Sequence, residues 1–248
     1  MSTVTQALEA GILTVTMNRP ELRNALDAAT YRALSAALAA ADADAGVRAV
    51  VLAGAGGHFT AGNDLRDFQA PAAAGEPPGI TFLKSLAEFG KPLLAAVEGV
   101  AVGIGTTLLL HCDLAFAGRG ARLRMPFVNL GLCPEGASTL LLPQTVGAKR
   151  ASEWLMLGRE ISGAEAAEAG LVTAAVDDGG ALRRAMETAR ELAALPPESV
   201  RVTKALLRRP EREAVLATFA AEIEEFQRRR ISPEAQAAFA AFFAKRAR

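Results

Sequence analysis

The feature that most constrains the fold is an apolar run at residues 47–53, interrupted only by Arg48, which leads directly into the glycine-rich turn 54–57. The run has the length of a β-strand. A strand that is apolar at every position, rather than at alternate positions, is typical of a parallel strand buried on both faces. We therefore expect this segment to lie inside the sheet of an α/β fold.

The segments around this run predict alternating strands and helices. Short apolar runs at residues 4–7 and 12–17 are separated by the turn 9–11, which predicts a hairpin. Apolar residues at helical spacing predict a helix over residues 27–41, with Asp27 as its N-cap. Further strands are expected at 93–97 and 113–117, and a helix at 103–110. This order favours stacked ββα units over a long-period solenoid.

From about residue 147 the pattern becomes mainly helical. One more strand is expected at 171–176, and helices are expected at 148–157, 163–169, 182–195, 198–208, 212–229 and 233–243. The change predicts an α/β core over residues 1–195 and a helical C-terminal subdomain over residues 196–248. Either a neighbouring subunit or the chain's own core must cover Phe239, Phe242 and Phe243 in the last helix. The Ala-, Pro- and Gly-rich residues 69–79 predict a mobile loop.

Composition excludes several classes of function. Lys plus Arg and Asp plus Glu each number 27 among 248 residues, so the formal net charge is zero. This balance argues against a nucleic-acid-binding protein and against a disordered chain. Two cysteines and two histidines are too few for a disulfide framework, and they disfavour a metal site. Without a secretory signal, and with a longest apolar run of about half a membrane span, the chain is expected to be cytoplasmic.

Several reactive-looking motifs lack an essential residue. Phe59 stands where a dinucleotide-binding fingerprint needs glycine, and no Lys-Ser or Lys-Thr follows to make a phosphate-binding loop. The stretch 136–140 fails the nucleophile-elbow pattern at its last position. His111, Cys112 and Asp113 follow an apolar run, so a helix end packed on the core is favoured over a reactive cluster.

Three other segments fit both a structural and a functional interpretation. Residues 58–65 fit either an ordinary turn capped by Asp64 or a turn whose backbone N–H groups face an anion. Residues 99–107 fit either a tight packing turn or an open helix N-terminus. Residues 125–136 place Glu135 among apolar neighbours. Burial there would raise its pKa, whereas a glutamate at a helix start is simply favoured by the helix dipole.

In this order and at these spacings, the segments resemble the crotonase superfamily, the enoyl-CoA hydratases and isomerases. The similarity covers nearly the whole chain, at residues 13–20, 23–26, 59–65, 97–105, 112–113, 161–166 and 170–172. It implies a spiral of ββα units with C-terminal helices that assemble a homotrimer or hexamer. It also implies that a thioester enolate is held by two backbone N–H groups, at the positions of Asn63 and Ile104.

Two departures from the family pattern bear on the reaction. Hydratases of this family carry two glutamates, and the matching positions here hold Thr107 and Phe127. Neither side chain is an acid or a base near neutral pH, so a hydratase built on that pair is not expected. Glu135 instead resembles the single catalytic glutamate of the Δ3,Δ2-enoyl-CoA isomerases, particularly the peroxisomal type. It would move a proton from C2 to C4 of a 3-enoyl-CoA.

The resemblance also implies the substrate contacts. An acyl-CoA thioester is the expected substrate, and its coenzyme A portion is the only cofactor-like group. The residues implied to bind it are Arg23, Ala25, Ala61, Asp64, Leu65, Gly103, Phe127 and Pro134, with Phe127 lining the acyl pocket. Two alternatives stay open: another crotonase-type reaction such as hydration, and an oligomer that binds acyl-CoA without turning it over.

Overall fold

The centre of the molecule is a six-stranded sheet, in a computed structural model that describes residues 2–68 and 76–246. The apolar run forms β3 (Ala49–Gly54), which lies between β2 (Ile12–Met17) and β4 (Leu93–Val97). β3 runs parallel to both neighbours, and residues 49–53 are all buried. The predicted buried parallel strand is confirmed.

The large sheet has the strand order β1-β2-β3-β4-β6-β9. Its remaining strands are β1 (Val4–Glu9), β6 (Leu114–Gly118) and β9 (Ala174–Val176). β1 and β2 form the predicted antiparallel hairpin, and the later neighbours in the sheet pair in parallel. Ala10 and Gly11 turn the hairpin with φ values of 50° and 77°, the left-handed backbone that a two-residue turn requires.

A second sheet of three strands is absent from the sequence predictions. It consists of β5 (Val100–Val102), β7 (Arg122–Arg124) and β8 (Glu160–Ser162). Strands of three residues are too short to give a periodic signal. β5 follows β4 after a two-residue turn and leads into α3 (Ile104–Thr107), so β4, β5 and α3 repeat the strand-strand-helix order of β1, β2 and α1 (Ala28–Ala43). This repeat is the predicted ββα unit.

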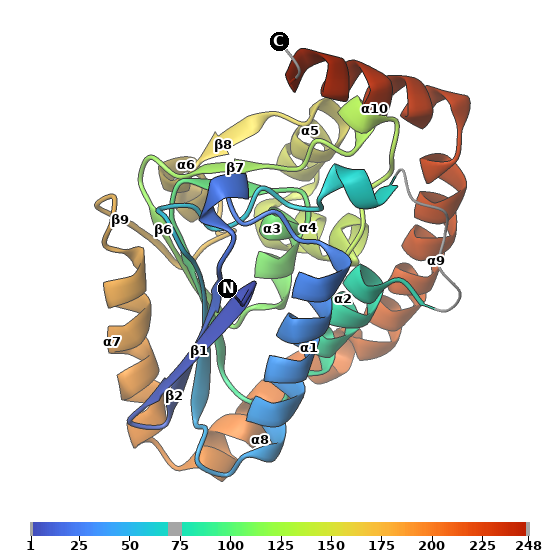
Figure 1. The fold of residues 1–248 in the computed structure, drawn as a ribbon. Coiled ribbons are helices and arrows are strands. Elements are labelled where there is room, and N and C mark those ends of the chain that lie inside the picture. The colour runs from blue at the N-terminus through green and yellow to red at the C-terminus, as the bar shows by residue number, and fades with distance from the viewer. Residues whose placement is uncertain (1, 69–75, 247–248) are drawn as a thin grey trace.

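Helices lie on both faces of the large sheet (Figure 1). The other helices are α2 (Pro78–Glu88), α4 (Ser138–Val146), α5 (Ala148–Leu157), α6 (Gly163–Glu168), α7 (Ala181–Ala194), α8 (Pro197–Arg208), α9 (Arg212–Arg230) and α10 (Pro233–Arg246). α7 covers one face through Ala181, Ala185 and Ala189, which share a buried cluster with strand side chains. α1 and α2 cover the opposite face (Figure 1). Asp27 caps α1 as predicted, since its carboxylate accepts the Thr30 N–H.

Two elements are shorter than the sequence predicts. The helix expected at 103–110 is the short α3 followed by a 3₁₀ turn, Leu108–His111. The strand expected at 171–176 is reduced to β9, because the N–H groups of Leu171 and Val172 donate to the Ala166 carbonyl at the end of α6. Of the loop predicted at 69–79, residues 69–75 lie outside the described residues, and residues 78–79 already belong to α2.

The C-terminal helices pack against the same core as the sheet. Phe239 of α10 is 2% exposed and belongs to the main buried cluster, so the chain's own core covers this ring. α10 also lies against the backbone near Gly131, where an added Cβ would come within 2.8 Å of Ala235. α8 is tied to the core by ion pairs from Lys204 and Arg208 to Asp113, at 2.8 and 2.9 Å. Within the described ranges, no helix is both long and apolar enough to cross a membrane.

Candidate active site

Two turns, one after β3 and one after β5, lie against each other. The Thr60 N–H donates to Val100 O, and the Val102 N–H donates back to Thr60 O, both at 3.0 Å. Gly62 then crosses directly over the second turn with a φ of 81°, and a Cβ added there would lie 2.4 Å from Val102 O. Only glycine tolerates both this backbone conformation and this approach. The contact brings the next residues, Asn63 and Ile104, to one place.

The backbone N–H groups of Asn63 and Ile104 donate no hydrogen bond to any residue that the structure describes. Their neighbours are paired: Asp64 N–H donates to Leu26 O at 2.9 Å, and Gly103 N–H donates to Arg124 O at 2.7 Å. Ile104 is buried and Asn63 is half-buried. Backbone donors away from water usually find a partner, so two such donors without a protein partner mark a place for an external acceptor. This pair of N–H groups suits a carbonyl oxygen that gains negative charge.

Glu135 lies in the loop before α4 and is 8% exposed. Its Oε1 accepts a hydrogen bond from Thr107 Oγ1 of α3 at 2.6 Å. Burial raises the pKa of Glu135 to about 8; the Thr107 hydrogen bond lowers it and the Glu222 charge raises it further. The interpretation of Glu135 as a buried carboxyl is therefore confirmed, and Glu135 precedes the helix rather than forming its first turn.

The loop that carries Glu135 has an unusual backbone. Gly136 and Ala137 both have left-handed φ values, 77° and 53°. His111 holds this turn, because its Nε2 lies 2.8 Å from the Gly136 carbonyl oxygen. A carbonyl only accepts, so Nε2 carries the proton. Burial, partly opposed by this hydrogen bond, lowers the pKa of His111 to about 4, and the ring is neutral. The predicted structural role of the His111 segment is confirmed.

Tyr31 of α1 joins the same region, although the sequence alone indicates only a core position for it. The Tyr31 hydroxyl donates to the Asn63 side-chain oxygen. Burial raises the pKa of Tyr31 well above 10, so the hydroxyl stays protonated. Phe127 lies near the second of the paired turns, because a Cβ added at Gly103 would be 4.0 Å from its ring. Phe127 is buried, and Pro134, directly before Glu135, is half-buried.

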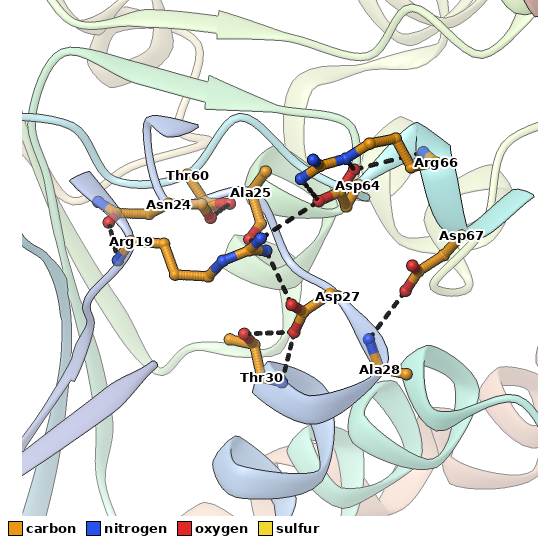
Figure 2. Close-up of polar contacts among 10 residues, drawn as sticks. All are labelled: Arg19, Asn24, Ala25, Asp27, Ala28, Thr30, Thr60, Asp64, Arg66 and Asp67. Carbon is orange, nitrogen blue, oxygen red and sulfur yellow. Dashed lines mark hydrogen bonds and ion pairs between the residues drawn. The ribbon is translucent and has the colours of Figure 1, made fainter. Parts of the chain in front are cut away.

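Two of the remaining predicted binding residues, Ala25 and Asp64, take part in a charged network on the neighbouring segment (Figure 2). Arg19 donates to Ala25 O at 2.6 Å and forms ion pairs with Asp27 at 3.1 Å and Asp64 at 3.4 Å. Arg66 binds the Asp64 carboxylate through two nitrogens, at 2.9 and 2.6 Å. The hydrogen bonds from Arg66 hold the pKa of Asp64 below its usual value.

Backbone contacts complete this second cluster. The Ala61 N–H donates to Arg23 O at 2.8 Å, and the Arg23 side chain is exposed. Leu65 begins a 3₁₀ turn and packs against the main core. The structure therefore separates the predicted residues into two groups. Asn63, Ile104, Gly103, Phe127, Pro134 and Glu135 surround the paired turns, whereas Arg23, Ala25, Ala61, Asp64 and Leu65 form the adjoining segment.

Glu135 is a buried carboxyl with a raised pKa, and it is hydrogen-bonded to α3, the helix that begins with one of the two unpaired backbone donors. Such an arrangement is suited to moving a proton next to a carbonyl group. The family model described as enoyl-CoA hydratase/isomerase matches residues 7–248. The chain belongs to this family, whose fold is the crotonase fold.

Individual relatives are similar over nearly the whole chain. The solved structure of OdaA from Pseudomonas aeruginosa is 45% identical with a TM-score of 0.94, covering 98% of this chain and 99% of that one. Human enoyl-CoA delta isomerase 2 is 33% identical over 97% of this chain, which spans only 63% of that protein's length. The 2,3-dehydroadipyl-CoA hydratase of Escherichia coli is 32% identical, covering 99% of this chain and 97% of that protein. The relatives thus include both isomerases and hydratases.

Proposed function

We propose that the protein is a Δ3,Δ2-enoyl-CoA isomerase that uses Glu135 as its single acid and base. The observation that carries this proposal is the buried carboxyl of Glu135, whose pKa is raised to about 8. The positions of the two hydratase glutamates hold Thr107 and Phe127, which supports a reaction that needs one carboxylate. The similarity to an enoyl-CoA delta isomerase supports the same class.

In the proposed reaction, the ionised Glu135 removes a proton from C2 of a 3-enoyl-CoA. The electron pair moves toward the thioester and leaves negative charge on its carbonyl oxygen. The N–H groups of Asn63 and Ile104 stabilise that oxygen, each by about 3 kcal/mol on the scale of single-donor deletions. Glu135 then returns the proton at C4, which yields the conjugated 2-trans-enoyl-CoA.

The environment of Glu135 suits both halves of this reaction. A group serves best as base and acid when its pKa lies near the working pH. A pKa of about 8 therefore makes Glu135 a stronger base than an exposed glutamate, while its protonated form still gives the proton back. The Thr107 hydroxyl bonds Oε1 at 2.6 Å and orients the carboxyl. No cofactor beyond the coenzyme A of the substrate is needed.

The charged segment is proposed to hold the coenzyme A portion of the substrate. Arg23 and Arg66 are exposed cations beside the backbone of residues 61–65. Phosphate groups are bound by such cations together with backbone N–H groups. A homotrimer or hexamer and a cytoplasmic location remain predictions from the family resemblance.

Hydration of a 2-enoyl-CoA is the second candidate, because the similar 2,3-dehydroadipyl-CoA hydratase covers the same length of chain. One assay separates the two. The purified protein is given a 3-enoyl-CoA and, separately, a 2-enoyl-CoA, and the ultraviolet absorbance of the conjugated thioester is followed. The isomerase proposal expects a rise with the first substrate and no fall with the second. A fall with the second substrate would establish hydration and refute the proposal.

A further inference from the structure

Glu222 of α9 is a buried carboxylate that the proposed reaction does not use. It is 6% exposed. Its Oε2 accepts the Ala137 N–H at 2.6 Å, and its Oε1 accepts the Thr139 N–H at 2.9 Å and the Thr139 hydroxyl at 2.6 Å. Burial raises the pKa of Glu222, and the hydrogen bonds from Thr139 and Ala137 oppose that shift. All three partners are donors, so the geometry favours the ionised form of Glu222.

These hydrogen bonds hold the turn that carries Glu135. Ala137 lies two residues after Glu135 and has a left-handed φ of 53°, which is unfavourable for a residue other than glycine. Such a conformation persists only when its surroundings enforce it. His111 holds the Gly136 carbonyl from one side, and Glu222 holds the N–H groups of Ala137 and Thr139 from the other.

Glu222 also dominates the charge near Glu135. Burial keeps the pKa of Tyr31 (α1) well above 10, raises that of the Cys133 thiol to about 11, and lowers that of His111 to about 4. All three groups are therefore neutral near pH 7. Glu225 and Arg229 of α9 act on Cys133, whereas Glu222 is the charge that acts on Glu135 and raises its pKa.

We propose that Glu222 is a positioning residue of the active site: its carboxylate fixes the turn that bears Glu135 and places a negative charge beside that base. The inference rests on the proposed role of Glu135 as the base. It gives the C-terminal helix α9 a part in the proton chemistry in addition to its part in packing.

Two variants of Glu222 separate the effect of its negative charge from the effect of its side-chain length. Glu222→Gln keeps the length and removes the charge, and Glu222→Asp keeps the charge and shortens the reach. Glu224→Gln, at an exposed position of the same helix, is the matched control. In Glu222→Gln the acid limb of kcat/KM moves to lower pH by on the order of one pH unit, since a like charge has been removed. In Glu222→Asp the limb stays and kcat falls by roughly tenfold or more, because the base is misplaced.

A purely structural role would lower activity in both variants without moving the limb in either. An unshifted limb in a folded Glu222→Gln protein overturns the charge assignment, and an unchanged kcat in Glu222→Asp overturns the positioning assignment. The Asp variant tests the proposal even where the Gln variant does not fold.

A second readout does not depend on turnover. Carboxyl ¹³C resonances of labelled glutamate are titrated by NMR, and Glu135 is assigned by the loss of its signal in Glu135→Gln. The midpoint is expected near 8 in the unmodified protein and lower in Glu222→Gln. If the unmodified protein does not convert a 3-enoyl-CoA, the proposed function fails. The titration still decides the inference in that case, because equal midpoints refute it.

Discussion

Glu135 and Asp64 are two carboxylates of neighbouring regions that the fold treats in opposite ways. Glu135 is buried and receives one hydrogen bond, from a neutral hydroxyl, and its pKa rises to about 8. Asp64, one residue after Asn63, is bound by two arginines, and its pKa is held below its usual value. The pKa of the same functional group is thus raised in one place and lowered in the other.

The comparison shows why only one of these carboxylates suits general acid–base chemistry. A carboxylate held ionised by arginines is a poor base, because its proton affinity has been lowered. The environments of two carboxyl groups can push their pKa values apart. The group whose pKa lies near the working pH is then the one suited to act as acid and base. In the proposed reaction that group is Glu135, and Asp64 braces the segment that follows Asn63.

The largest expected effect follows from removing the acid–base group. Glu135→Gln keeps the shape of the side chain and is expected to reduce kcat by about 10²–10⁴-fold, the usual contribution of a positioned acid or base. Glu168→Gln, at an exposed position, is the control and should leave kcat unchanged. Steady-state kinetics with a 3-enoyl-CoA measure both. Retained activity in Glu135→Gln would show that Glu135 is not the acid–base group.

The next effect concerns the contact between the two turns. Gly62→Ala puts a Cβ 2.4 Å from Val102 O and forces the N–H groups of Asn63 and Ile104 apart. Loss of one oxyanion donor costs about 10²–10³ in kcat. Gly57→Ala is the matched control: its φ of 74° is equally left-handed, but nothing lies within 4 Å of the new Cβ. Equal losses of kcat in both variants would attribute the effect to backbone strain alone.

The raised pKa of Glu135 also predicts how stability depends on pH. The folded protein binds this proton more tightly than the unfolded chain, whose glutamate pKa is near 4.5. The corresponding stability is present below pH 4.5 and is lost as the pH rises through about 8. Urea titrations at pH 5 and pH 8.5 measure the free energy of unfolding of both proteins. Between these two pH values, the free energy of unfolding of Glu135→Gln relative to that of the unmodified protein should rise by on the order of 3 kcal/mol. A pH-independent difference would contradict the raised pKa.

A smaller effect is expected in the charged network. The Arg19 side chain is 13% exposed and pairs with Asp27, Asp64 and Ala25 O, so Arg19→Ala leaves several polar groups unpaired. The free energy of unfolding should fall by about 1–3 kcal/mol. Arg66 also pairs with Asp64 but is 60% exposed, so Arg66→Ala should cost under about 1 kcal/mol. Chemical denaturation measures the free energy of unfolding of both variants. A larger loss in Arg66→Ala than in Arg19→Ala would place the centre of the network at Arg66.

The elements that could be predicted from the sequence are those with a local signal. The hairpin turn, the buried strand β3 and the Asp27 cap each depend on a few adjacent residues. The burial of Glu135 was also open to prediction, because its apolar neighbours lie beside it in the sequence. The resemblance to a known family added the positions of Asn63 and Ile104.

What could not be predicted depends on contacts between distant residues. Thr107 reaches Glu135 across 28 positions, and Glu222 reaches Ala137 across 85. A glutamate among several in α9 carries no local sign that its carboxylate binds another turn. The three strands of the second sheet were missed for a related reason, since each has three residues and gains its identity only from its partners.

The most direct test of the single-base mechanism follows the transferred proton. A 3-enoyl-CoA deuterated at C2 is incubated with the protein in ordinary water, and the conjugated product is examined by NMR. Because Glu135 is only 8% exposed, part of the deuterium is expected to stay on the carboxyl and arrive at C4. A product without deuterium at C4, accompanied by the 3-hydroxyacyl compound, would contradict a single sheltered base and indicate hydration instead.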